Sequence, residues 1–173
     1  MTSSRRSGLG AAVAAVSIAA LGLIAPQAVA ADTPQPGVKV SARADATTRA
    51  IAAQNPEKVQ AMAVLCGSGY ELYSVDLLPD DRRFGTLFSY VKGGTGPSNY
   101  ACALFDNNSE GARYMKLKIC ENKVSSPRCD TDEGNFTQYA GPVRMNNCPE
   151  ITAIMKNSSG VAIIDAVRGP FCG

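Results

Sequence analysis

Histidine is absent from the 173 residues, and so is tryptophan. Without histidine the chain cannot form a Ser-His-Asp triad, a Cys-His pair, a histidine general acid or base, or a zinc site containing histidine. The chemistry that remains open is carboxylate catalysis, a Ser-Lys dyad or a metal site made of cysteine alone. A cysteine zinc site is not indicated, because the sequence has no Cys-x-x-Cys pair.

A long apolar run that could span a membrane is also missing. Residues 1–30 instead have the features of an export signal, with Arg5 and Arg6, an uncharged run over 8–24 and a small-x-small cleavage site at 28–30. The run is rich in alanine and short for a spanning helix. We expect cleavage before Ala31, with the general secretion route favoured over the twin-arginine route because disulfides form after export.

No excess of one charge remains once the signal is removed. The 143 residues that follow contain 15 basic and 15 acidic side chains, about one domain's worth of chain. A nucleic-acid-binding protein usually shows a basic stripe, and none is visible. We therefore expect a secreted single domain that has no nucleic-acid partner and no membrane association after signal cleavage.

Cysteine is the residue type in which this chain is rich. The six cysteines all follow the signal: Cys66, Cys102, Cys120, Cys129, Cys148 and Cys172. An even number in an exported chain predicts three disulfides. Of the 15 possible pairings we favour nearest neighbours. On the chain-entropy model the three cross-links stabilise the fold by about 10 kcal/mol in total, which is comparable to the whole stability of a typical domain.

Four segments are expected along the chain. Residues 1–30 are the signal peptide, 31–54 a disordered arm or a trimmed pro-segment, 55–65 a short helix and 66–173 a secreted β domain. Residues 31–54 lack periodic apolar positions, which favours disorder. Asn55-Pro56-Glu57 provides an N-cap, a proline at the first helical position and an acidic first turn, which predicts the start of the helix.

After Cys66 the apolar residues alternate with polar ones, as is typical of β-strands. The pattern predicts strands at 71–78, 84–91, 100–105, 114–120, 151–156 and 161–167, and a further one within 129–143. The clearest alternation, in 114–120, points Met115, Leu117 and Ile119 inward. About seven short strands separated by turns predict an all-β fold, a disulfide-stapled β-sandwich or open barrel with a short N-terminal helix.

The stretch Cys129–Val143 is expected to organise this domain. It begins with an acidic turn, 130–134, continues as a strand with aromatic residues, and is stopped by Gly141-Pro142 because proline cannot donate to a sheet ladder. The turn is similar to the one before the tyrosine-corner strand of immunoglobulin domains. However, Gln138 stands at the position where an immunoglobulin domain has a cysteine, and tryptophan is absent. Both features argue against a true immunoglobulin domain.

Several of these segments together resemble the spore-associated protein A family, small secreted proteins of sporulating filamentous bacteria. The segments are Cys66-Gly-Ser-Gly-Tyr70, Ala101-Cys-Ala-Leu-Phe-Asp-Asn-Asn108, Tyr114-Met-Lys-Leu117, Cys129-Asp-Thr-Asp-Glu-Gly134 and Tyr139-Ala-Gly-Pro-Val143. The resemblance covers residues 66 to about 165. It implies a protein on or near the spore surface, and it implies no reaction, cofactor or catalytic residue.

The leading functional hypothesis is a non-enzymatic secreted protein of the spore surface or outer cell wall, with a structural or surface-interaction role. Its partners are then spore-surface or cell-wall components, or another extracellular protein. The alternative is a small secreted binding protein such as a protease inhibitor or a wall-glycan binder. No catalytic residue, cofactor or metal ligand is predicted.

Five charged residues are candidates for interaction: Lys92 in the loop 92–98, Arg128 in the loop 121–128, and Asp130, Asp132 and Glu133 of the acidic turn. Rigid loops suit an inhibitor because preorganisation lowers the entropic cost of binding. The acidic cluster leaves a third class open, a wall-glycan hydrolase with paired carboxylates. We disfavour it, because three acids in one turn are more often solvated or loosely bound to a cation.

Overall fold

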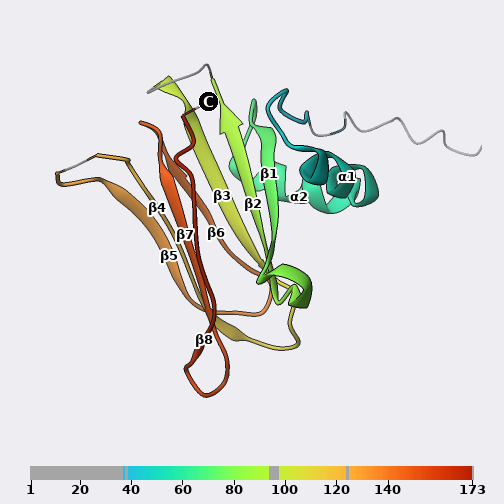
Figure 1. Cartoon of the computed structure of the whole chain (residues 1–173), viewed down its shortest axis with the longest axis vertical. Helices are drawn as coiled ribbons and strands as arrows, with labels where there is room; N and C mark the ends of the chain where they lie inside the picture. Colours follow the sequence, from blue (N-terminus) through green and yellow to red (C-terminus); the bar gives the residue numbers. More distant parts are fainter. Residues whose placement is uncertain (1–36, 38, 94–97, 124, 173) are drawn as a thin grey trace, which may run out of the picture. The chain divides into compact units, whose positions relative to one another are not determined.

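The computed structural model describes residues 37, 39–93, 98–123 and 125–172, which contain eight strands in two antiparallel sheets (Figure 1). The first sheet has the order β1-β2-β3-β6 and consists of β1 (Glu71–Leu78), β2 (Gly85–Lys92), β3 (Tyr100–Asn107) and β6 (Tyr139–Met145). The second sheet has the order β5-β4-β7-β8 and consists of β4 (Arg113–Cys120), β5 (Cys129–Phe136), β7 (Glu150–Lys156) and β8 (Ala162–Arg168). The all-β expectation is confirmed, and the predicted export signal lies outside the described residues.

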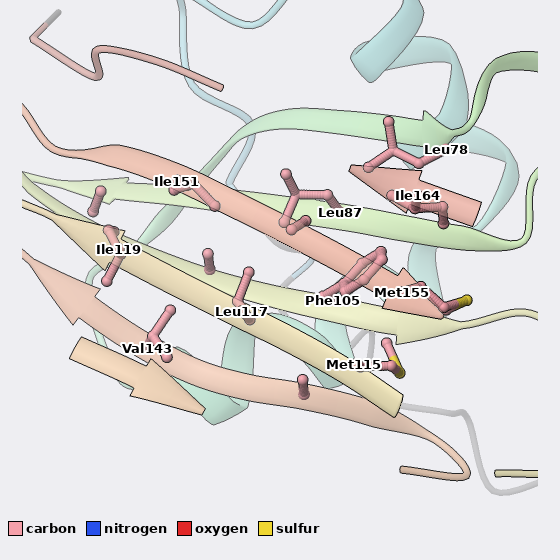
Figure 2. Packing of buried hydrophobic residues seen from close by; sticks show 14 of the residues in the cluster. Leu78, Leu87, Phe105, Met115, Leu117, Ile119, Val143, Ile151, Met155 and Ile164 are labelled. Carbon is pink, nitrogen blue, oxygen red and sulfur yellow. The ribbon is translucent and has the colours of Figure 1, made fainter. Parts of the chain in front are cut away.

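The two sheets pack face to face and enclose an inner core (Figure 2). Leu87 and Phe105 of the first sheet meet Leu117 and Met155 of the second, and all four side chains are fully buried. The predicted inward residues of 114–120 are among the core residues, so the strand periodicity placed them correctly. The other buried members are Leu78, Ala101, Ala103, Met115, Ile119, Ala140, Val143, Ile151, Ala153, Ile164 and Phe171. The arrangement is therefore a β-sandwich.

The opposite face of the first sheet is covered by two helices, α1 (Ala46–Gln54) and α2 (Pro56–Cys66), which lie beside β1 in Figure 1. Helix α2 begins at the predicted proline and ends where Gly67 adopts a φ of +97°. A second hydrophobic cluster, the helix-side core, joins the helices to the sheet. Its buried members are Val59, Met62, Ala63, Cys66, Leu72, Val75, Phe88, Tyr90, Cys102 and Leu104.

All six cysteines are paired as nearest neighbours in the chain, which confirms the favoured connectivity. Cys66–Cys102 joins the end of α2 to β3, Cys120–Cys129 joins the end of β4 to the start of β5, and Cys148–Cys172 ties the C-terminal segment to the residues before β7. Disulfides form and persist in oxidising compartments. The three cross-links therefore indicate an extracellular or otherwise oxidising environment.

The structure corrects the expectation of a disordered arm over residues 39–54. Val40 forms a parallel bridge with Leu72, and α1 follows, capped by the Asp45 side chain, which accepts a hydrogen bond from the Thr48 N–H at 2.6 Å. The buried hydroxyl of Thr48 in turn accepts from the Val75 N–H at 3.1 Å. The helix is positioned by these polar contacts with β1 more than by an apolar stripe, so its sequence lacks the expected periodicity. A pro-segment role for residues 31–54 stays a prediction.

The central stretch also differs from expectation. Residues 130–134 form part of β5, which pairs with β4 along its whole length, and are not a turn. Gly141-Pro142 does not stop the next strand, because β6 runs from Tyr139 to Met145. The dipeptide lies at an irregularity where the register of β6 against β3 shifts. The stretch therefore supplies two strands, one to each sheet, and the total is eight instead of about seven.

Gly141 generates the first prediction. Its φ is +102°, and a Cβ placed there would lie 2.8 Å from the carbonyl oxygen of Ala103 and 3.0 Å from the Leu117 Cδ2. We expect Gly141→Ala to lower the free energy of unfolding by about 1–3 kcal/mol, because it adds both backbone strain and a steric clash. Denaturant titration measures the change.

Gly134 of β5 provides the matched control. Its φ lies outside the left-handed region, and a Cβ there would make an ordinary contact at 3.5 Å with the ring of Phe136. Gly134→Ala should change the free energy of unfolding by less than about 0.5 kcal/mol. Equal stability of the two variants would show that the β6 backbone tolerates a side chain at Gly141.

Candidate functional site

The acidic residues that the sequence singled out are used in joining the strands. The Asp130 carboxylate accepts a hydrogen bond from the Arg144 N–H at 2.8 Å, and the Asp132 carboxylate accepts from the Gly141 N–H at 2.7 Å. These side chains of β5 thus satisfy backbone donors of β6, the edge strand of the other sheet. Glu133 forms a surface ion pair with Lys116 at 2.7 Å across β4 and β5.

The other two candidates, Lys92 and Arg128, lie together in a groove at one end of the sandwich. The groove has a volume of about 540 Å³ and is lined by seven residues, of which three are cationic, two are tyrosines and none is acidic. We call these seven residues the cationic groove: Tyr70, Lys92, Tyr100, Arg128, Arg144, Met145 and Asn146.

Strand register gathers these side chains from five distant segments. Lys92, the last residue of β2, lies opposite Tyr100, the first residue of β3. Arg144 of β6 lies opposite Cys102 on the other side of β3. Tyr70 directly precedes β1, and Arg128 directly precedes β5 of the second sheet. The groove therefore exists only because the strands pair in this register.

Each of the three cations is anchored by protein acceptors. The Lys92 Nζ donates to the Ser68 carbonyl at 2.9 Å. Arg144 donates from Nε to the Cys66 carbonyl at 3.3 Å and from Nη2 to the Leu65 carbonyl at 2.6 Å. The Leu65 and Cys66 carbonyls lie at the end of α2, where backbone acceptors lack helical partners and positive charge is favoured. The contacts hold both side chains in place without neutralising them.

Arg128 is anchored differently, through the buried carboxylate of Glu121. The Glu121 side chain is completely inaccessible to solvent, and it accepts hydrogen bonds from the Arg128 Nε at 3.0 Å and from the Asn147 Nδ2 at 2.7 Å. Lys123 completes the network with an ion pair at 3.0 Å. The Arg128 guanidinium, followed by the Lys123 and Asn147 contacts, outweighs burial and holds the pKa of Glu121 well below its usual range.

The two tyrosines supply the uncharged part of the lining. The Tyr100 side chain is half exposed, with 50% of its surface accessible, although it is large and apolar. Tyr70 is partly buried, and its ring lies 5.8 Å from the Lys92 Nζ, a cation–π distance. Burial is the main cause that raises the pKa of Tyr70, and the nearby Arg144 opposes it. The phenol is therefore neutral at physiological pH.

All three disulfides lie close to the groove in the sequence. Cys66 comes four residues before Tyr70, Cys102 two after Tyr100, Cys129 one after Arg128 and Cys148 two after Asn146. Covalent links at these points restrict the backbone that carries the lining side chains. The groove is thus a largely preformed surface, which lowers the entropic cost of binding.

Comparisons with protein-family models, with curated proteins and with solved structures find no match to this chain. The resemblance to the spore-associated protein A family therefore stays a prediction. Among the described residues, no group of three or more Cys, Asp or Glu side chains is arranged to hold a metal ion. Nor does any helix in that part of the chain have the length and apolarity to cross a membrane.

Sequence reasoning identified Lys92 and Arg128 but missed the other five lining residues. Tyr70 and Tyr100 stand at strand boundaries next to glycine-rich or loop segments, where an aromatic side chain often escapes burial. That position was the available signal. Arg144 had none, because its neighbours, the carbonyls at the end of α2, lie 78 and 79 residues away in the chain.

The Glu121 network generates a prediction about acid stability. The pKa of Glu121 is lower in the folded protein than the ordinary value of 4.5. The ionised carboxylate therefore adds to the free energy of unfolding above about pH 4.5, and this stabilisation is lost as the pH falls through the folded pKa. Glu121→Gln should therefore lower Tm most at neutral pH. The difference from the wild type should narrow between pH 4.5 and pH 2 in thermal melts.

Glu133→Gln is the control for this experiment. Glu133 also accepts from a lysine, but its side chain is 49% exposed, and exposed ion pairs contribute little. Its substitution should change Tm only slightly at every pH. A Tm difference between wild type and Glu121→Gln that stays constant from pH 7 to pH 2 would contradict the assigned role of the buried carboxylate.

Proposed function

We propose that the protein is a non-enzymatic secreted protein of the spore surface or outer cell wall, and that it acts by binding. The cationic groove carries this proposal, because it places anchored cations and exposed aromatic surface on a cross-linked scaffold. The oxidising environment indicated by the disulfides supports export. The sequence resemblance supports the spore surface as the location.

The state of the acidic residues supports a binding role over a hydrolytic one. Hydrolysis of a glycan needs two carboxylates placed across a cleft from each other. Asp130 and Asp132 instead accept hydrogen bonds from backbone N–H groups of β6, and Glu133 faces solvent beside Lys116. None of the three lines the cationic groove.

The small-binding-protein alternative has two forms, and the structure bears on them differently. The groove supports a wall-glycan binder. A protease inhibitor would use the loop 121–128, which is closed by the Cys120–Cys129 disulfide and by the Glu121 N–H donating to the Arg128 carbonyl at 2.9 Å. That loop presents Arg128 toward the groove and fastens its side chain to Glu121, so we favour the glycan binder.

The location is tested on intact spores with an antibody against the folded protein. We expect labelling of spores from the wild-type strain and none from a strain that lacks the gene. Intact-mass measurement of the extracted protein should show a mature N-terminus at Ala31 and all six cysteines oxidised. Protein found only in the fluid of vegetative cultures would contradict the proposed location.

A further inference from the structure

We infer that the cationic groove binds an anionic glycan, that is, a sugar unit that carries a phosphate or a carboxylate group. This inference rests on the proposed binding function and names the chemical class of its ligand. Three features of the groove carry it: uncompensated positive charge, unused hydrogen-bond donors and aromatic faces beside them.

The charge of the groove fits an anion. Lys92, Arg128 and Arg144 line it and no acidic residue does. The ion pairs among the described residues include Arg128 with Glu121 but neither Lys92 nor Arg144. Like charges gathered in this way repel one another, and a bound anion would offset that repulsion. An anion in the groove is attracted by at least Lys92 and Arg144, which have no ion-pair partner among the described residues. Phosphate and carboxylate are the groups that arginine and lysine bind most strongly.

Hydrogen-bond capacity is left over for such a ligand. Arginine carries five N–H donors and the lysine ammonium carries three. Arg144 uses Nε and Nη2 for the two α2 carbonyls, and Lys92 uses one donor for the Ser68 carbonyl. The remaining donors of both side chains have no acceptor among the described residues. Because the used donors fix the orientation of each side chain, the remaining ones are already positioned for a ligand.

The aromatic residues indicate that the anion is attached to a sugar. Tyr100 exposes half of its surface and Tyr70 lies beside it in the groove, whereas Met145 is the only aliphatic residue of the lining. A tyrosine ring offers an apolar face for the C–H groups of a pyranose and a hydroxyl for its polar edge. The Asn146 Oδ1 accepts from the Arg128 Nη2 at 3.3 Å, and its amide N–H groups can donate to sugar hydroxyls. A volume of about 540 Å³ lies within the usual range of ligand sites.

The test uses the purified protein from residue 31 to residue 173, with its disulfides oxidised, and four probes in calorimetric titrations. A poly(glycerol phosphate) polymer substituted with sugar carries phosphate, oligogalacturonate carries carboxylate, chitin hexasaccharide carries no charge, and inorganic polyphosphate carries charge without sugar. We expect binding to one or both of the first two, with affinity that falls as NaCl is raised because the contacts are electrostatic. Which of the two binds more tightly distinguishes the phosphate from the carboxylate source.

Variants assign the binding to the groove. Lys92→Ala/Tyr100→Ala should weaken binding about tenfold or more, since it removes one charged hydrogen bond and one stacking face. The matched control is Lys156→Ala/Tyr114→Ala, which removes the same residue types from a cation–π pair at 4.5 Å that does not line the groove. That control should bind like the wild type. Lys92→Glu alone is a second groove variant, which serves if the double variant proves unstable in thermal melts.

Several results would overturn the inference. They are equal binding of chitin hexasaccharide, equal binding of polyphosphate, no binding of either anionic glycan, or equal loss of affinity in the groove and control variants. Any of these leaves the location on the spore surface standing if the antibody still labels intact spores. Conversely, glycan binding that depends on Lys92 and Tyr100 supports the inference even when the antibody finds the protein elsewhere.

Discussion

The three disulfides are the constraint on which the rest of this structure depends. They join α2 to β3, β4 to β5, and the C-terminal segment to the residues before β7. Every cross-link has a cysteine within four residues of a side chain that lines the cationic groove. A sandwich of this size gains stability from each link, because the unfolded chain loses conformational freedom. Here the links also fix the loops and strand ends that carry the lining, so the same covalent bonds serve the stability of the fold and the shape of its candidate site.

The opposite charges of the chain are used in different places. Carboxylates join elements of the fold to one another. Asp130 and Asp132 of β5 accept hydrogen bonds from the backbone of β6, and Asp76 of β1 pairs with Arg168 of β8 at 2.7 Å. The buried Glu121 binds Arg128 at the other end of the loop 121–128. The first two of these contacts connect one pair of sheet edges and the third connects the other pair. Lys92 and Arg144 are held instead by backbone carbonyls. A chain whose charges balance over residues 31–173 thereby acquires a locally cationic surface.

Sequence periodicity was sufficient for the strands whose inner side chains are apolar. In β4 the alternation of Met115, Leu117 and Ile119 with lysines clearly indicates a strand. The bounds predicted for β1 are those observed. Periodicity failed for β5, where two of the half-buried positions are aspartates that accept from the β6 backbone, and for α1, which is held by the Thr48 hydroxyl. In each case a polar contact replaces the hydrophobic one that periodicity detects. Only two of the seven groove residues, Lys92 and Arg128, were predicted from the sequence. The groove depends on strand register, as where pairing of β2 with β3 makes Lys92 and Tyr100 neighbours, and sequence spacing does not specify that register.

The grouping of Lys92, Arg128 and Arg144 disfavours the folded state by itself, because like charges repel and a half-exposed Tyr100 leaves apolar surface in water. A chain selected only for stability would pair Lys92 and Arg144 with carboxylates, as Arg128 is paired with Glu121, and it has 15 acidic residues to draw on. Each cation is instead anchored by acceptors that hold it in position, and Arg128 is anchored by a buried carboxylate that also binds Lys123 and Asn147. Departures from the most stable arrangement concentrate where a protein interacts with something else. The groove combines such departures with a preformed surface, and this combination is the physical reason for the proposed binding role.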